Sequence, residues 1–319
     1  MLIKKIKKRL YPIIQKLLYT GKLYKITNKL KIYHPRIVTN IDGGLGSQMW
    51  QFAFGYATAN KANLPLSLHT DFYNWGCDCN GVKNRQFLLF DVFPAIRAVY
   101  SDCIEKSDEY RNIFTDRSKR TTYEFYPEIG KLHKPIFLSQ YYANVKYIHE
   151  YREKLRAFFA FDVQLDLYEK DIENQINKTN SCFVHIRKGD FVGLSRDICT
   201  KLYYVRAMLK MLEMVPDVVF YIFSNDEKYF EKHIRASLHA CECRVISVRS
   251  ENTPQVDLYL MSICKHAIIA NSGFSWMAAY LNSQSGHVIM PDIWDSKPEN
   301  KEKSKMAFYV PGWHQLPVE

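Results

Sequence analysis

Residues 181–223 read SCFVHIRKGDFVGLSRDICTKLYYVRAMLKMLEMVPDVVFYIF, two short apolar runs with a helical repeat between them. The runs at 181–187 and 218–223 are rich in β-branched and aromatic residues, which is typical of buried strands. Residues 201–214 repeat apolar side chains at helical spacing, and we expect one face of this helix to lie in the core: Leu202, Val205, Leu209 and Leu212. A strand–helix–strand unit of this kind predicts two neighbouring parallel strands.

The alternation continues towards the C-terminus. We expect further elements in the order helix 227–240, strand 244–248, helix 255–264, strand 266–270, helix 274–281 and strand 287–290. Strands that alternate with helices predict a parallel sheet with helices on both faces. The segment after Pro291 is charged and irregular, and we expect it to cross back towards the N-terminal half of the chain.

The N-terminal half follows the same alternation less clearly. A strand over 37–41 precedes a glycine-rich loop and a helix over 48–61, whereas residues 64–146 hold aromatic clusters and prolines with few periodic runs. With 319 residues and 47% apolar content, the chain is long enough for two domains. We therefore expect an α/β protein with three parts: an arm over 1–36, an N-terminal domain over 37–177 and a C-terminal domain over 178–319.

The net charge of +11 is concentrated at the N-terminus. Residues 1–36 hold eleven Lys and Arg and no acidic residue, which leaves 33 basic against 33 acidic residues in the rest of the chain. A balanced body without a second basic patch argues against a nucleic-acid partner. The arm places apolar residues at helical spacing opposite its cations, so it fits either the anionic surface of a membrane or a helix packed on the body.

Eight cysteines include the pairs Cys77/Cys79 and Cys241/Cys243, each separated by one residue. That spacing is tighter than the usual pair of zinc ligands, and no histidine pair lies at a complementary distance. Free thiols in a reducing compartment are therefore the better interpretation, and we expect no metal site.

Three polar clusters follow predicted strands of the C-terminal half: His185 to Asp190, Ser224 to Asp226, and Asn271 to Ser275. Ligands of open parallel sheets bind beyond the carboxyl ends of the strands, so we expect one common site. Ser272 or Ser275 can cap the helix that follows, and its free N–H groups favour an anion. Arg187 and Lys188 add positive charge that suits a diphosphate. The alternative is that Ser272 is only a cap and Arg187 only part of a surface ion pair.

The loop Asp42 to Gln48, DGGLGSQ, places three glycines between a predicted strand and a predicted helix. It is not a dinucleotide-binding fingerprint, because Met49 stands where the third glycine would be, and it lacks the G-K-[ST] ending of a Walker loop. Glycines at this place still allow a ligand to approach the backbone closely.

Four motifs together resemble those of family 11 fucosyltransferases, in the same order along nearly the whole chain beyond the arm. They are 43–55 (GGLGSQMWQFAFG), 184–191 (VHIRKGDF), 223–226 (FSND) and 271–276 (NSGFSW). The resemblance implies a GT-B-like fold, in which two Rossmann-like domains with parallel sheets face a cleft. It also implies that the N-terminal domain faces the acceptor, while the C-terminal domain holds GDP-fucose without a divalent metal. The absence of an Asp-x-Asp pair agrees with the last point.

The resemblance also implies roles for individual residues. Arg187 contacts the diphosphate with Lys188 beside it. From its place next to this motif, Asp190 is the candidate general base, with orientation of Arg187 or a bond to a loop amide as its alternative role. His185 and Asp226 are candidates for contacts to guanine. The remaining candidates form two groups. The residues of the second domain line the phosphate and base pocket: Ser272, Gly273, Phe274 and Ser275. Those of the first domain approach the sugar-phosphate from the opposite side: Gly44, Gly46, Ser47 and Gln48.

Three positions depart from the family pattern. Lys188 replaces an arginine, Ser47 an asparagine and Gly273 a serine that are common at these places. Lys188 keeps the charge but loses the planar fork of donors. At Ser47 and Gly273 a side-chain donor is lost, so a backbone N–H or a water has to replace it.

The expected reaction is the inverting transfer of L-fucose from GDP-fucose to the 2-hydroxyl of a terminal β-galactoside on a glycan. Two other hypotheses stay open: a fucosyltransferase of other regiochemistry (α-1,6 or protein O-fucose), and a non-catalytic, membrane-recruited nucleotide-binding module. No apolar run approaches the roughly 20 residues that a spanning helix needs, and no signal-peptide cleavage site is evident. We therefore expect a bacterial protein that is cytoplasmic, or peripheral on the inner membrane face.

Overall fold

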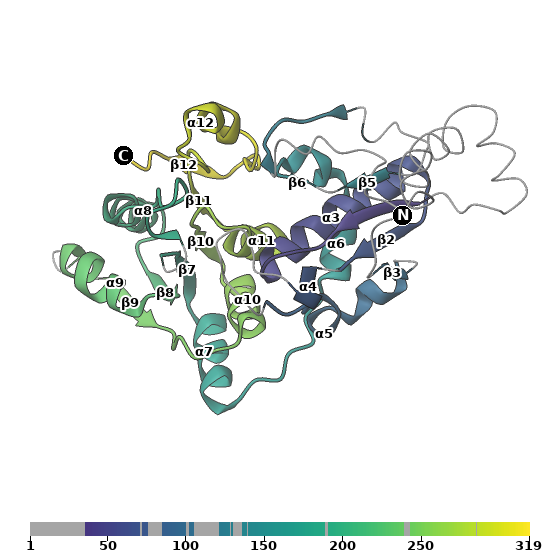
Figure 1. Cartoon of the computed structure of the whole chain (residues 1–319). Coiled ribbons are helices and arrows are strands. Elements are labelled where there is room, and N and C mark those ends of the chain that lie inside the picture. Colours follow the sequence, from purple (N-terminus) through teal and green to yellow (C-terminus); the bar gives the residue numbers. More distant parts are fainter. Residues whose placement is uncertain are drawn as a thin grey trace, which may run out of the picture.

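The computed structural model describes residues 36–70, 72–75, 85–99, 102–104, 121–127, 129, 136–138, 140–188, 191–238, 243–284 and 286–319. Within these ranges the chain forms two larger parallel sheets, with helices packed against them, and one two-stranded parallel sheet (Figure 1). The arm predicted over 1–36 lies outside the described residues except for Arg36, and Asp190 also lies outside them. Predictions about these residues therefore stay predictions.

The first sheet has the strand order β3-β2-β1-β5. Its strands are β1 (Ile37–Asn40), β2 (Leu66–His69), β3 (Asp102–Ile104) and β5 (Ile136–Leu138), and each neighbouring pair is parallel. Between β1 and β2 runs α3 (Leu45–Ala62), which is buried around nearly its whole circumference. A helix that is apolar all round belongs in the core, and α3 packs on β1 on one side and on the second unit on the other.

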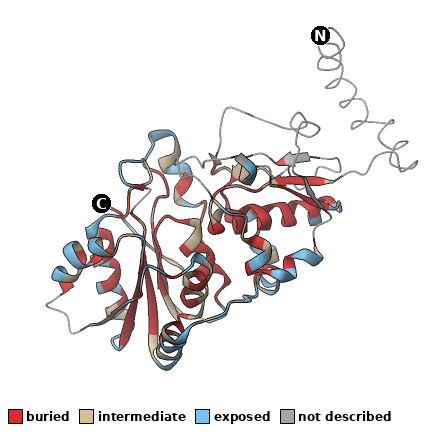
Figure 2. Ribbon diagram, turned by 60° about the horizontal axis from the view of Figure 1, so that its bottom comes forward, coloured by how far each residue is buried: buried red, intermediate tan, exposed pale blue. Residues whose placement is uncertain are grey.

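The second sheet has the strand order β12-β11-β10-β7-β8-β9, and all its neighbouring pairs are parallel. The strands are β7 (Asn180–Ile186), β8 (Val218–Ser224), β9 (Arg244–Ser247), β10 (His266–Ile268), β11 (Val288–Pro291) and β12 (His314–Leu316). β7 and β8 are buried on both faces, as Figure 2 shows for the centre of this sheet. The predicted parallel α/β architecture is confirmed.

Helices cover both faces of the second sheet. They are α7 (Leu167–Lys178), α8 (Lys201–Met214), α10 (Pro254–Ile263) and α11 (Gly273–Leu281), followed near the C-terminus by α12 (Pro298–Lys305). The short helix α9 (Glu227–Tyr229) continues as a π-helical turn over Phe230–Ile234 and a 3-10 turn over Arg235–Leu238. α7 packs on α10 and β7, so it contacts the second sheet. The division between domains at residue 178 stays a prediction.

Short elements occupy the stretch between β2 and α7. They are α4 (Phe72–Trp75), α5 (Leu89–Val92), α6 (Arg152–Phe158), the strands β4 (Thr121–Thr122) and β6 (Tyr141–Tyr142), and 3-10 turns at Pro94–Ala98, Val145–Tyr147 and His149–Tyr151. None of the described helices is both long and apolar enough to cross a membrane.

Two sequence expectations need correction. In α8 the predicted core face is wrong for Leu202 and Leu209, which are 45% and 36% exposed, whereas Val205 and Leu212 do pack against the core. The fully buried residues of α8 are Tyr203, Tyr204, Ala207, Met208 and Met211. The segment after Pro291 is not irregular, because it forms α12 and then β12 at the edge of the second sheet. Between these two elements it does return to the first half, where the Val145 N–H donates to the carbonyl of Ala307 at 2.7 Å.

One apolar core joins the two sheets. Trp50 of α3 meets Trp276 of α11 edge to face, with ring centroids 4.9 Å apart, and Phe308 packs 5.0 Å from Trp50. Both indole N–H groups donate to buried carbonyls, Trp50 to Tyr142 at 2.9 Å and Trp276 to Phe308 at 2.8 Å. Because large aromatic side chains dominate core energetics, this contact fixes α3 against α11.

Candidate active site

The three polar clusters meet at one edge of the second sheet. β7 lies between β8 and β10, and the register pairs His185 with Phe223, Ile186 with Ser224, and Val184 with Ile268. The residues that follow each strand therefore lie side by side at the carboxyl edge. This is the arrangement that the sequence predicts for a single site.

The first turns of α3 and α11 touch each other at this edge (Figure 1). A Cβ atom on Gly46 would lie 2.5 Å from the backbone nitrogen of Phe274 and 2.9 Å from the carbonyl carbon of Gly273. Only glycine permits such an approach of two backbones. Gly44 is the N-cap of α3 and Ser272 the N-cap of α11, where the Phe274 N–H donates to the Ser272 hydroxyl at 3.4 Å. Two helix N-termini, each with free N–H groups and the positive end of a dipole, thus lie together.

His185 lies at the α11 side of β7. Its ring centroid is 5.7 Å from that of Phe274, and only 4% of the residue is exposed. Burial, together with the positive charge of Arg187, lowers the pKa of His185 to about 3, so the ring is neutral at physiological pH. Its Nδ1 atom is buried and has no hydrogen-bond partner in the described part of the chain. A neutral imidazole with an uncommitted nitrogen suits a polar ligand atom.

Arg187 follows His185 with one residue between them, so strand alternation places it on the same side. Its guanidinium carbon lies 5.3 Å from the centroid of the Phe191 ring. Lys188 behaves differently, because it is 7% exposed and its ammonium pairs with Asp197 at 2.7 Å and lies 4.7 Å from the Tyr229 ring centroid. Lys188 therefore does not join Arg187 as a second cation for a ligand, because its ammonium is paired on the side of α8 and α9.

Several residues that were predicted to contact the ligand form hydrogen bonds with the protein's own backbone instead. The amide of Gln48 is fully buried, donates to the carbonyls of Gly43 (3.2 Å) and Gln86 (2.8 Å), and accepts from Leu88 N–H at 3.0 Å. The Ser275 hydroxyl donates to the Ser272 carbonyl at 3.4 Å. Asp226 accepts from the Tyr229 N–H at 3.1 Å and so caps α9. These three side chains shape the edge of the site, whereas Ser47 is partly exposed in the first turn of α3.

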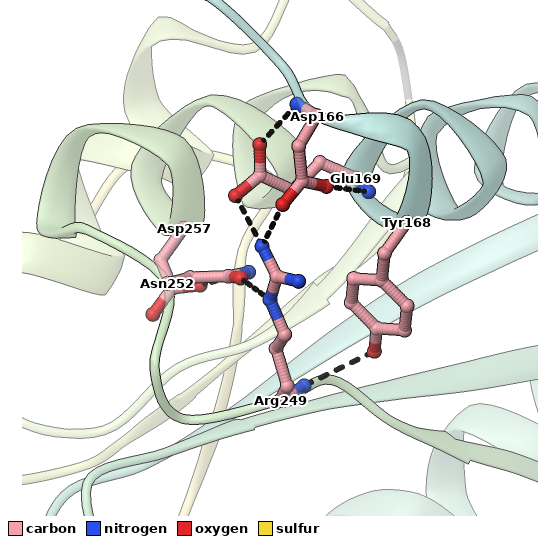
Figure 3. Close-up of polar contacts among 6 residues, drawn as sticks. All are labelled: Asp166, Tyr168, Glu169, Arg249, Asn252 and Asp257. Carbon is pink, nitrogen blue, oxygen red and sulfur yellow. Dashed lines mark hydrogen bonds and ion pairs between the residues drawn. The ribbon is translucent and has the colours of Figure 1, made fainter.

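Asp257, which no sequence motif indicated, lies in the first turn of α10, a helix that packs on α11. Burial raises the pKa of its carboxyl to about 7, and the Asn252 amide donates to it at 3.1 Å. Asn252 also accepts from Arg249 Nε at 2.6 Å, and Arg249 binds both carboxylates at the start of α7, Asp166 and Glu169 (Figure 3). The sequence signal that could have indicated Asp257 is its position in the first turn of a helix that follows a strand.

The first unit contributes side chains that the motifs did not indicate. The Tyr141 hydroxyl lies 3.2 Å from the position that a Cβ atom on Gly273 would occupy. An Nη atom of Arg85 lies 3.5 Å from the corresponding Cβ position on Gly44. Tyr73 donates to the Gly43 carbonyl at 3.1 Å, and Asp42 accepts from the Gln51 amide at 2.9 Å. Arg85, Tyr141 and Tyr73 come from the segment 64–146, where no periodic pattern pointed to them.

The described chain thus consists of two parallel α/β units whose helix N-termini meet beside a strand-end arginine, at the edge where open parallel sheets bind their ligands. The chain belongs to glycosyl transferase family 11, whose model matches residues 95–317.

Relatives agree with this class. The chain is 30% identical over 286 residues to the alpha-1,2-colitosyltransferase of Escherichia coli, covering 82% of this chain and 93% of that protein. It is 24% identical over 306 residues to the galactoside 2-alpha-L-fucosyltransferase of Caenorhabditis elegans, covering 92% and 82%. Among solved structures it resembles POFUT1 in its apo form (TM-score 0.46, 11% identity, 81% and 97% covered) and the fucosyltransferase NodZ from Bradyrhizobium (TM-score 0.46, 12% identity, 77% and 92% covered).

Proposed function

We propose that this protein transfers L-fucose from GDP-fucose to the 2-hydroxyl of a terminal β-galactoside, with inversion and without a metal ion. The observation that carries the proposal is the backbone contact of Gly46 with Gly273 and Phe274, which joins two helix N-termini beside His185 and Arg187. Such a place favours a diphosphate. Family membership and the names of the two relatives support sugar transfer to a 2-hydroxyl.

The proposed donor lies along the carboxyl edge of the second sheet. Its diphosphate accepts from the N–H groups at the start of α11 and from Arg187. Guanine presents the N1–H and N2–H donors side by side, which suits a carboxylate. Two carboxylates are candidates for this contact: Asp226, which also caps α9, and Asp257, which also accepts from the Asn252 amide. His185, neutral and with a free nitrogen, contacts the nucleotide beside Phe274.

In the proposed step, the bond between C1 of the sugar and the β-phosphate oxygen breaks, and its electron pair stays on that oxygen. C1 forms a bond to the acceptor oxygen from the opposite face, and the acceptor proton passes to a general base, for which Asp190 remains the candidate. Negative charge grows on the departing GDP, where Arg187 and the backbone N–H groups stabilise it as preorganised donors. These groups supply the electrostatic role that a divalent ion has in other transferases.

A second donor deserves a direct comparison, because the relative with 30% identity is named for transfer of colitose, the 3-deoxy counterpart of fucose. The two sugars differ by one hydroxyl. A site that hydrogen-bonds this hydroxyl rejects the deoxy donor strongly, whereas an apolar site tolerates both. Measuring kcat/KM for GDP-fucose and GDP-colitose with the same acceptor decides between them.

The central test is product analysis after incubation with GDP-fucose and a β-galactoside. We expect a new α-1,2 linkage and unchanged rates after treatment with a chelator. An α-1,6 linkage, or fucose on a protein hydroxyl, would replace the proposal with other regiochemistry. Tight GDP binding without turnover on any glycan would favour the non-catalytic nucleotide-binding module.

A further inference from the structure

Asn271 follows β10 and immediately precedes Ser272, the N-cap of α11. It is buried, with 3% of its surface exposed, and its side-chain amide bonds to segments that follow other strands. The Nδ2 atom donates to the carbonyl of Arg196, after β7, at 2.9 Å and to that of Trp294, after β11, at 3.1 Å. Since β10 lies between β7 and β11 in the sheet, Asn271 links the carboxyl ends of three neighbouring strands.

A third bond fixes the orientation of the Asn271 amide. The Cys199 thiol donates to its Oδ1 atom at 3.4 Å. Burial raises the pKa of Cys199 to about 12, so the thiol keeps its proton at neutral pH. Because a backbone carbonyl can only accept, the Nδ2 atom has to face the two carbonyls and Oδ1 the thiol. The amide therefore cannot turn without leaving buried polar groups unpaired.

These bonds hold the far end of the segment that begins with Arg187. At the near end, the Lys188 N–H donates to the side-chain oxygen of Asn225, after β8, at 2.9 Å. Between the two ends, the Lys188 ammonium pairs with Asp197 at 2.7 Å. The place of Arg187 relative to the start of α11 is therefore set at both ends of the segment, and Asn271 is the attachment on the side of α11.

We propose that Asn271 is a positioning residue, which holds the N-terminus of α11 and the segment of Arg187 at the separation that one diphosphate bridges. This inference rests on the proposed function. The first N–H groups of a helix have no partner within it, so they are available to a diphosphate together with a guanidinium. Groups that stand in place beforehand bind a ligand more tightly, because no ordering cost offsets the contacts. Without the amide, α11 keeps its N-cap Ser272 but loses its attachment to the neighbouring strand ends.

The test compares the parent protein with Asn271→Ala, Asn271→Ser and the matched control Asn282→Ala. All three variants are neutral, so none adds charge beside a diphosphate. Asn282 is also buried and lies at the other end of α11, where its amide donates to the Cys264 carbonyl and accepts from the Gln284 N–H at 2.7 Å. Binding of GDP is measured by calorimetry, and binding of guanosine, which lacks the phosphates, by competition with GDP.

The inference predicts a loss that is selective for the diphosphate. We expect Asn271→Ala to weaken GDP binding about 10- to 100-fold and guanosine binding by less than about 3-fold. Its kcat with GDP-fucose should fall about 10²-fold, because the preorganised donors to the leaving group lose their alignment. Asn271→Ser retains one short donor and should show the same selectivity with a smaller loss. Asn282→Ala should lower the melting temperature and keep the affinity for GDP.

A merely structural Asn271 gives a different pattern. In that case Asn271→Ala lowers the melting temperature as the control does and weakens GDP and guanosine by the same factor, which overturns the inference, as does unchanged affinity for GDP. If Asn271→Ala does not fold, the ratio of GDP to guanosine affinity in Asn271→Ser decides. If the parent binds neither GDP nor GDP-fucose, the proposed function itself fails, and the role of Asn271 fails with it.

Discussion

Arg187 and His185 stand two positions apart at the end of β7, so both side chains lie on the side of α11. Lys188 falls on the other side, where Asp197 pairs with it. The motif His-x-Arg-Lys-Gly-Asp predicted a site at the end of β7 and treated Arg187 and Lys188 as one cationic pair. The period of two along a strand separates them, and that signal was present in the sequence.

Replacing Arg187 tests the main electrostatic contribution. We expect Arg187→Ala to lower kcat about 10²- to 10³-fold, because a preorganised donor to the leaving group is lost. Arg187→Lys should also lose most activity, since an ammonium cannot reproduce the two parallel bonds of a guanidinium. Steady-state kinetics with GDP-fucose and a β-galactoside measures both, with circular dichroism to verify folding. Turnover of Arg187→Ala close to that of the parent would remove Arg187 from the mechanism.

Asp257 predicts a pH dependence of stability. Its folded-state pKa of about 7 lies above the ordinary value of 3.8, so between about pH 4 and pH 7 the folded state holds a proton that the unfolded state has released. The contribution of Asp257 to stability is therefore present at acidic pH and lost as the pH rises through 7. We expect Asp257→Asn to raise the melting temperature more at pH 8 than at pH 4.5. An equal gain at both pH values would contradict the raised pKa. The same variant should weaken GDP binding if the carboxylate contacts guanine.

At the scale of elements, the second unit was predictable because its central strands, β7 and β8, are buried on both faces and its strands alternate with helices. The bounds of α8 are those predicted, but only part of its buried face is. The predicted face consisted of leucines and Val205 and left out Tyr203, which buries its ring and donates to the Ile269 carbonyl at 2.6 Å. The stretch 64–146 could not be read in this way, because its elements are two to five residues long and too short to show a period.

The contact between α3 and α11 gives a prediction at this scale. Gly46→Ala would place a methyl group 2.5 Å from backbone atoms of α11, which cannot rotate away. We expect it to lower the free energy of unfolding by about 1–3 kcal/mol and to abolish measurable GDP binding by moving the two helix N-termini apart.

Gly55→Ala is the matched control for this change. It lies in the same helix, and its added Cβ would meet the side chain of Thr39 at 2.6 Å, on the side of β1. It should therefore lose stability and keep its affinity for GDP. If both variants lose stability while both retain GDP affinity, the junction of α3 and α11 is only a packing contact. Thermal melting and calorimetry on the two variants decide the matter.

At the scale of the molecule, the shared core of Trp50, Trp276 and Phe308 makes the two sheets one packed body. This continuity was not predictable, since each tryptophan lies in a motif that similarity assigns to a different domain. This packing has a consequence for the candidate site. Burial of Trp50, Trp276 and Phe308 holds α3 against α11 and so stabilises the junction of their N-termini. The candidate site then needs no ligand to bring its two walls into contact.

The concentration of charge at the N-terminus gives the last prediction. Residues 1–36 carry eleven cations and no acidic residue, and each Lys or Arg near an anionic membrane contributes about 1 kcal/mol of binding. Deleting residues 1–35 keeps Arg36, which donates to the Ser67 hydroxyl at 3.3 Å, and should therefore leave β1 and the fold intact. We expect the full chain to co-sediment with vesicles of anionic lipid and to dissociate at high salt, and we expect the truncated chain not to bind them. GDP affinity should be equal in both proteins.

A different result would show that the arm packs on the body of the protein. In that case the full chain stays in solution with anionic vesicles, and truncation lowers the melting temperature.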